Sequence, residues 1–364
     1  MVANMTTFED DSIQMKIWEP NLIVLPITES RKSVNTCLQI AIGITNNTPI
    51  PFPFFYEILA PELLSINGQV LHPQNKIKRQ ITPSLYNSIA IPSKKTLICY
   101  LIANFSWQNS LFQLQWNIST HFQVSTHPDH NWFFDTFQMG TYELRFIYNS
   151  PSGEFTVLDV STGDKLRRES SLVKPLITTS VLVRFIEPME SHKNAVEVNG
   201  IRFETVVSEQ IWNISHSQLS DVSSSIQIGL RITNNTSISQ RFCSFTTLIP
   251  ELMGANGCSL AQNLGGGSTG WVGAGESDYH LLKPKESVTF FVSAHIERQT
   301  DGLLNLIVRG TGRGYWSFNG LELGTYQVRL TYRSLTNPLD IRLFEDFWRG
   351  MVHTPFVEFC LVQP

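Results

Sequence analysis

The sequence has few charged residues. Asp, Glu, Lys and Arg make up 16% of its 364 residues, and the net charge is −4, whereas about a quarter of the residues is charged in a typical soluble protein. No basic run or stripe is long enough to follow a phosphate backbone. We therefore expect no nucleic-acid partner.

Long hydrophobic runs and paired cysteines are also missing. No stretch reaches the roughly 18 apolar residues of a membrane-spanning helix, and the N-terminal residues have neither the positive region nor the apolar core of a secretory signal. The five cysteines are odd in number and do not recur at matched positions in the two halves of the chain, which argues against a disulfide framework. The sequence thus predicts a cytoplasmic protein whose free cysteines act as small buried hydrophobes.

One strand pattern, by contrast, is present twice. Residues 37–48 and 225–236 each alternate apolar residues with small or polar ones and end in Asn-Asn-Thr. Strict alternation is typical of a strand with one buried face, and Asn and Thr side chains favour a turn. The residues predicted to line two separate cores are Leu38, Ile40, Ile42 and Ile44 in the first copy and Ile226, Ile228, Leu230 and Ile232 in the second.

Further signals recur in the same order. A Pro-Glu-Leu tripeptide, centred on Glu62 and Glu251, precedes an Asn-Gly dipeptide that ends at Gly68 and Gly257. Asn-Gly is the dipeptide that most favours a tight hairpin turn. Because both glutamates recur, we interpret them as scaffold that satisfies backbone donors at a turn.

The most specific repeated block is Gly-Thr-Tyr followed by an alternating strand, at Tyr142 and Tyr326. It resembles the tyrosine corner of immunoglobulin-like sandwiches, in which the hydroxyl bonds to the backbone upstream. Residues 338–350 are the only helical candidate and have room for a short helix at most. The predicted fold is all-β, with two tandem immunoglobulin-like antiparallel β-sandwich domains, residues 1–188 and 189–364, that arose by internal duplication.

Potential metal ligands gather in one loop of the first half, at His127, Asp129 and His130. Histidine with carboxylate suits zinc or iron. However, Pro128 and Asn131 mark a turn, where such residues are common for solubility alone. We favour a solvated turn and expect neither a metal nor a cofactor.

A glycine-rich segment, residues 265–275, distinguishes the second half. It has no Gly-Lys-Ser/Thr and no following helix pattern, so it is not a phosphate-binding loop. Its Trp271 is a candidate partner contact, together with Tyr279 and Tyr315, because exposed aromatics frequently anchor partners. The alternative is that Trp271 packs on its own domain.

The order of these signals resembles immunoglobulin-like sandwich proteins of the bacterial cytoplasm, among them uncharacterised bacterial proteins and, more weakly, the intracellular proteinase-inhibitor family. The resemblance implies a fold rather than an activity. We expect a non-enzymatic binding or scaffolding protein that contacts another protein through variable loops or sheet edges. The alternatives are a proteinase inhibitor and a metal-dependent enzyme centred on His127 and His130.

Overall fold

A computed structural model describes most of the chain. The described residues are 12–27, 36–55, 59–71, 88–108, 111–120, 123–124, 134, 139–149, 154–158, 165–169, 174–188, 193–214, 225–245, 247–266, 274–299, 301–310, 314–334 and 344–363. Most of these residues lie in β-strands, which confirms the predicted all-β class. Within these ranges the only helical element is one 3-10 turn, η2 (Glu276–Asp278), and residues 344–350 of the predicted helix are not helical.

The chain forms two compact units. The first contains Met1–Asn21 and Asn35–Val183, and the second contains Leu22–Val34 and Arg184–Pro364. The chain passes from the first unit to the second within β15 (Val181–Ile186). The segment Leu22–Val34 thus belongs with the second unit, although it lies in the half of the sequence assigned above to the first domain.

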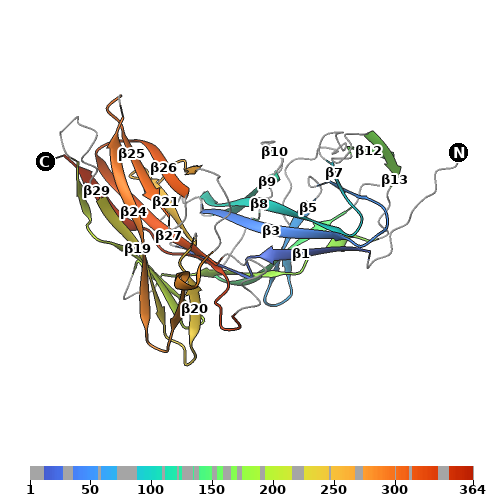
Figure 1. The fold of residues 1–364 in the computed structure, drawn as a ribbon, viewed down its shortest axis with the longest axis horizontal. Coiled ribbons are helices and arrows are strands. Elements are labelled where there is room, and N and C mark those ends of the chain that lie inside the picture. Colours follow the sequence, from blue (N-terminus) through green and yellow to red (C-terminus); the bar gives the residue numbers. More distant parts are fainter. Residues whose placement is uncertain are drawn as a thin grey trace. The chain divides into compact units, whose positions relative to one another are not determined.

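The first unit contains one long antiparallel sheet and two smaller groups of strands (Figure 1). The long sheet has the order β1 (Ile13–Glu19), β3 (Thr36–Asn46), β8 (Lys95–Gln108), β9 (Leu111–Thr120), β10 (Gln123–Val124). In the second group β11 (Gly140–Tyr148) pairs with β14 (Leu176–Ile177) and with β5 (Leu59–Ser65), which pairs with β6 (Val70–Leu71). The third has the order β13 (Lys165–Glu169), β12 (Glu154–Leu158), β7 (Ser88–Ile91), β4 (Phe52–Phe55).

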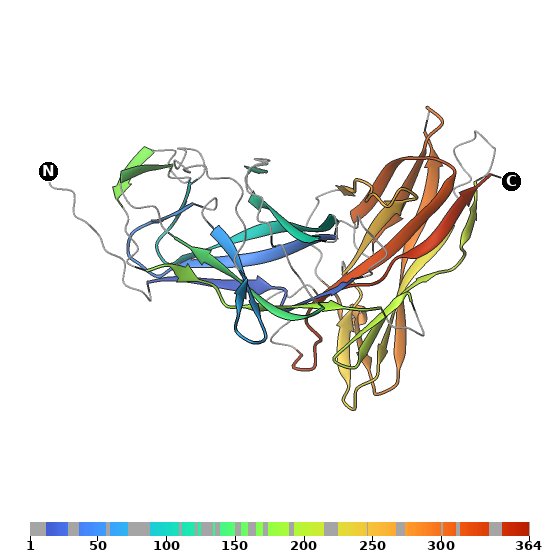
Figure 2. The ribbon, with the colours of Figure 1, turned by 180° about the vertical axis from the view of Figure 1, so that it is seen from behind.

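The second unit has two main sheets, seen from opposite sides in Figures 1 and 2. The first has the order β16 (Ala195–Val198), β17 (Ile201–Val207), β19 (Ser225–Asn234), β24 (Ser287–Arg298), β25 (Leu304–Arg309), β26 (Gly314–Leu321), β22 (Asn263–Gly266). The second contains β18 (Ile211–Asn213), β29 (Val357–Val362), β27 (Gly324–Arg333), β28 (Met351–His353) and β2 (Leu22–Pro26), with β21 (Leu248–Gly254) paired to β27. A separate pair is β20 (Gln240–Cys243) with β23 (Tyr279–Leu282).

The core of the second unit lies between its two main sheets. Ile228 and Leu230 of β19 are fully buried in one hydrophobic cluster with Leu330 of β27 and Phe359 of β29. The other predicted core positions of β19, and the four of β3, are buried as well, at 7% exposure or less. The alternating pattern therefore predicted correctly which faces of β3 and β19 are buried.

The two Asn-Asn-Thr turns have the same hydrogen bonds. The side-chain amide of Asn46, which is fully buried, donates to Ile50 O at 2.8 Å and to Ile91 O at 2.9 Å. The amide of Asn234 donates to Ile238 O and Leu282 O at the same distances. In each turn the Asn Oδ1 also accepts from the backbone N–H and the hydroxyl of the Thr two residues on. The first Asn of each motif thus ties the end of its strand to two other segments.

The Asn-Gly turns also form as predicted. Gly68 and Gly257 have φ of 75° and 76°, a conformation that glycine adopts without strain. In each turn the glycine N–H donates to a carbonyl three residues earlier. The first turn joins β5 to β6, and the second follows β21.

Tyrosine hydroxyls form hydrogen bonds with the backbone at two kinds of position. The Tyr326 hydroxyl donates to Glu322 O at 3.0 Å and accepts from Glu322 N–H at 2.9 Å, which confirms the predicted upstream bond. Tyr142 is buried. A second tyrosine, six residues further along each strand, was not predicted: Tyr332 donates to Cys243 O, and Tyr148 donates to Pro53 O.

Replacing Tyr332 by Phe is expected to lower the free energy of unfolding by about 1–3 kcal/mol, because two buried hydrogen bonds to Cys243 are removed. Tyr326→Phe is the matched control, since its hydroxyl bonds at an exposed site and should cost under about 0.5 kcal/mol. Urea unfolding of both variants measures the difference. Equal losses of unfolding free energy in the two variants would show that the buried Tyr332 hydroxyl contributes no more than an exposed one.

Candidate binding site

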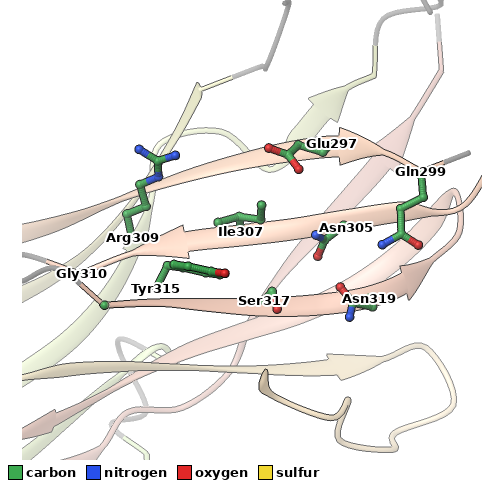
Figure 3. A pocket seen from close by; sticks show the side chains of 10 residues that line it. Glu297, Gln299, Asn305, Ile307, Arg309, Gly310, Tyr315, Ser317 and Asn319 are labelled. Atoms are coloured by element: carbon green, nitrogen blue, oxygen red, sulfur yellow. The ribbon is translucent and has the colours of Figure 1, made fainter. Parts of the chain in front are cut away.

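The second unit has a hollow of about 850 Å³ on the outer face of its β24–β25–β26 sheet (Figure 3). Its lining comes from these three strands and the turns next to them. The lining residues are Glu297, Gln299, Asn305, Ile307, Arg309, Gly310, Gly314, Tyr315, Ser317 and Asn319. A volume of this size lies within the range of small-molecule sites.

Strand alternation puts these side chains on the outer face. In β25, Leu304, Leu306 and Val308 are buried in the core, so the intervening Asn305, Ile307 and Arg309 point to the other face. Pairing then aligns them in rows: Glu297 lies opposite Asn305, Ile307 opposite Ser317, and Arg309 opposite Tyr315. The hollow is therefore a two-dimensional array of side chains from three strands that follow one another in the sequence.

Tyr315 lies against the backbone of its neighbouring strand. Its cross-strand partner in β22 is Gly265, and a Cβ added to Gly265 would be 2.3 Å from the Tyr315 Cζ atom. Only glycine therefore allows the ring to lie so close. The ring remains 40% exposed, so it forms a supported aromatic surface at one end of the hollow.

Polar groups dominate the rest of the lining. Glu297 and Arg309 have opposite charges, so their formal charges cancel, and His295 Nε2 lies 3.1 Å from Glu297 Oε1. Asn305 Oδ1 is buried and has no hydrogen-bond partner in the part of the chain that the structure describes. A buried polar atom without a partner is uncommon in folded proteins.

Hydrogen-bonding side chains make up most of the lining. They are Glu297, Gln299, Asn305, Arg309, Tyr315, Ser317 and Asn319. The side chains that line the hollow can hold and orient a polar ligand.

A second polar cluster, buried in the same unit, involves Glu251, Arg329, Thr331 and His353. Glu251 Oε2 accepts from Arg329 Nη2 at 2.6 Å, and Glu251 Oε1 accepts from the Thr331 hydroxyl at 2.7 Å. His353 Nδ1 lies 3.0 Å from Glu251 Oε1 and 2.7 Å from Thr331 Oγ1. The cluster is made by cross-strand neighbours, because Arg329 lies opposite Glu251 and Thr331 lies opposite His353.

The cluster is not arranged as a catalytic triad. In a triad the hydroxyl and the carboxylate bond to different nitrogens of the histidine, whereas here Thr331 and Glu251 both meet Nδ1. Thr331 and His353 are also buried, at 1% and 0% exposure. The cluster is therefore part of the buried interior, and in the first unit Glu62 and Arg145 form a cross-strand pair of the same kind.

Burial and charge set the ionisation of this cluster. Burial raises the pKa of the Glu251 carboxyl, but the Arg329 guanidinium and the hydrogen bond from His353 outweigh that effect and hold the pKa well below its usual range. Burial lowers the pKa of His353, although Glu251 opposes the shift. The imidazole is therefore neutral in the folded protein near neutral pH.

The lowered pKa of His353 predicts a loss of stability in mild acid. The unfolded chain binds a proton at this histidine below about pH 6.5, whereas the folded state resists protonation, so the free energy of unfolding falls as pH drops from about 7 to 5. His353→Gln should flatten this slope, as measured by urea unfolding across that window. An unchanged slope in the variant would contradict the assignment.

The residues predicted as partner contacts lie in different places. Tyr315 lines the hollow. Tyr279 lies in β23, with its ring centroid 5.1 Å from that of Phe344 and 6.0 Å from that of Phe347. Trp271 lies outside the described residues, as do the metal candidates His127, Asp129 and His130. Among the described residues, no group of three or more His, Cys, Asp and Glu could hold a metal ion.

Two interpretations of individual residues need correction. Glu62 and Glu251 lie within strands and pair with arginines across the ladder, so they do not serve turn backbones. Cys99 and Cys243 are buried as expected, and burial raises the pKa of Cys99 to about 12. The expectation is wrong for Cys258, which is exposed because it follows the Asn-Gly turn at the surface.

The other hollow residues were missed from sequence. Asn305, Ile307 and Arg309 alternate with the buried Leu304, Leu306 and Val308. That alternation was the available signal.

Comparison with protein-family models and with curated proteins gives no match. No helix among the described residues is long and apolar enough to cross a membrane.

Proposed function

We propose that the protein is a non-enzymatic binding protein whose ligand occupies the hollow of the second unit. The observation that carries this proposal is the combination of Tyr315, supported on Gly265, with a buried, unpartnered Asn305 Oδ1 on the same sheet face of the described chain. The aromatic ring offers a contact surface, and the amide oxygen offers a directional acceptor. Concave sites with a few convergent polar groups are where ligands bind.

This proposal places the contact on a sheet face, in place of the variable loops or sheet edges expected from the sequence. Tyr315 stands at the start of β26, and the hollow lies on the outer face of that strand and of β24 and β25. The proteinase-inhibitor and metal-dependent-enzyme hypotheses stay predictions. The metal hypothesis rests on residues outside the described part of the chain. The cytoplasmic location also stays a prediction.

We also propose that both units are immunoglobulin-like sandwiches related by internal duplication. Three matched sets of contacts support this. They are the Asn46 and Asn234 turns, the hydrogen bonds from the Tyr148 and Tyr332 hydroxyls to backbone carbonyls, and the Glu62–Arg145 and Glu251–Arg329 ion pairs. Shared long-range contacts of this kind are harder to reach by chance than a shared strand pattern.

A thermal-shift screen tests the binding proposal. The panel contains neutral oligosaccharides, short polar peptides, amino acids and nucleotides, each added to the full chain. A ligand at 100 times its Kd stabilises the folded state by about 2.7 kcal/mol, which raises Tm by about 5–10 °C for a unit of this size. We expect at least one ligand class to give such a shift in the wild type and to lose it in Tyr315→Ala.

Phe291→Ala is the matched control for Tyr315→Ala. Phe291 is also an exposed aromatic on a cross-strand glycine of the same sheet, Gly229, but it does not line the hollow. Its replacement should leave the ligand shift intact. A screen with no shift, or an equal shift in Tyr315→Ala, contradicts the proposal, and chemical conversion of a bound ligand contradicts its non-enzymatic part.

A further inference from the structure

We infer that the ligand of the hollow is a neutral saccharide chain, an inference that rests on the proposed binding function. Three properties of the lining carry it: a supported aromatic ring, a set of side chains that both donate and accept hydrogen bonds, and balanced charge. Each favours a polyhydroxylated, uncharged ligand over the other classes that a hollow of this size admits.

The first property is the aromatic ring of Tyr315. One face of the Tyr315 ring lies against Gly265, and the residue is 40% exposed. The face of an aromatic ring carries negative charge in its quadrupole and attracts weakly positive C–H groups. A sugar ring presents a flat patch of such C–H groups between its hydroxyls, so it can stack on Tyr315 without burying a polar group.

The hydrogen-bonding groups come second. Gln299, Asn305, Ser317 and Asn319 are amides and a hydroxyl, and each can donate and accept. Sugar hydroxyls have the same dual character, so every lining group can be paired in either direction. Asn305 Oδ1 in particular has no partner in the part of the chain that the structure describes.

The charges come third. Glu297 and Arg309 leave the hollow formally neutral, although Glu297 lies opposite Asn305 at one end of the array and Arg309 lies opposite Tyr315 at the other. No lysine lines the hollow, so a phosphate would find a single guanidinium rather than the cluster of basic side chains that binds phosphate well, which disfavours nucleotides. Ile307 is the one aliphatic lining side chain, which leaves little apolar surface for the side chains that anchor peptides.

The length of the array indicates a chain rather than a single sugar. Asn305 and Arg309 lie four residues apart on one strand, which corresponds to about 13 Å at the rise of an extended strand. Tyr315 lies opposite Arg309, at the same end of the array. A saccharide stacked on Tyr315 must therefore extend past Ile307 to reach Asn305.

Calorimetric titration of the full chain with neutral oligosaccharides tests the inference. The probes are glucose, xylose, mannose and N-acetylglucosamine oligomers of increasing length, together with a glycoprotein before and after removal of its glycans. We expect one series to bind with an affinity that rises with length and then levels off. Binding of the glycoprotein only, lost on removing its glycans, identifies a protein-borne source of the same chemistry.

Variants make the test specific to the hollow. Tyr315→Ala should weaken binding by about tenfold or more, as for loss of an aromatic stacking surface, whereas Tyr315→Phe keeps the ring and should bind within a few-fold of the wild type. Asn305→Ala should weaken binding as well, and Phe291→Ala should not. An unaltered melting temperature of each ligand-free variant shows that it is folded.

Failure of this inference can be told apart from failure of the binding proposal. If a peptide, amino acid or nucleotide binds in a Tyr315-dependent manner and no saccharide does, the saccharide inference is overturned and the binding proposal stands. If no class binds, both are overturned. Saccharide binding that survives Tyr315→Ala and Asn305→Ala overturns the assignment to this hollow.

Discussion

Asn234→Ala is expected to lower the free energy of unfolding of the second unit by about 3 kcal/mol or more. The side chain makes four hydrogen bonds, to Ile238 O, Leu282 O and the N–H and hydroxyl of Thr236, and the residue is fully buried. Each buried group left without its partner costs about 1–3 kcal/mol. The loss should be visible as a lower urea midpoint of the second unit's transition.

Two variants serve as controls for Asn234→Ala. Asn235 is the next residue, and its side-chain amide bonds to Glu197 at an exposed site, so Asn235→Ala should cost under about 0.5 kcal/mol. Asn46→Ala removes the matching contacts of the first unit and should destabilise that unit comparably. If Asn234→Ala costs no more than Asn235→Ala, the turn is not a structural anchor.

Glu251→Gln is expected to cost about 3–5 kcal/mol. Arg329 is 1% exposed, and the substitution leaves its buried guanidinium without a charged partner, a loss that typically has this magnitude. His353 and Thr331 lose the same carboxylate acceptor. Urea unfolding at neutral pH measures the effect, since the lowered pKa keeps Glu251 ionised there.

The first unit supplies a matched control for Glu251→Gln. Glu62 pairs with Arg145 at the equivalent ladder position, but the Arg145 side chain is 30% exposed whereas that of Arg329 is 2% exposed. Water can solvate the arginine left by Glu62→Gln, so this variant should cost clearly less. Equal losses would show that burial of the guanidinium does not set the energy of the pair.

Local sequence patterns predicted the parts of the fold that local chemistry controls. Alternation identified the buried faces of β3 and β19, and the Asn-Gly dipeptides identified tight turns at Gly68 and Gly257. The bond of Tyr326 to Glu322 spans four residues and was predicted as well. These features depend on side chains and backbone close together in sequence.

Contacts between distant residues could not be predicted in the same way. Tyr332 and Cys243 are 89 residues apart, and Glu251 and Arg329 are 78 apart. Their pairing depends on sheet register, which a single sequence does not specify. Strand β2 was missed for a different reason: Leu22, Ile23, Val24 and Leu25 are all buried, and a strand covered on both faces has no alternation.

The candidate site was only partly predictable. Tyr315 was selected as an aromatic candidate for partner contact, and it does line the hollow. Asn305 and Ser317 were not selected, because a single polar residue in an alternating strand is the normal pattern of any solvated face. Only the pairing of β25 with β26 and the close approach of Tyr315 to Gly265 turn these positions into one surface.

Hydrogen exchange of the full chain tests the central claim, that the hollow is the ligand site, most directly. The probe is the neutral oligosaccharide or other panel compound that gives the largest thermal shift, added to the wild type, Phe291→Ala and Tyr315→Ala. The claim predicts that the ligand slows exchange in Leu304–Arg309 and Gly314–Leu321 of the wild type and of Phe291→Ala. In Tyr315→Ala the ligand should leave the exchange of these two strands unchanged. Ligand-induced protection elsewhere, with these two strands unchanged, would contradict it.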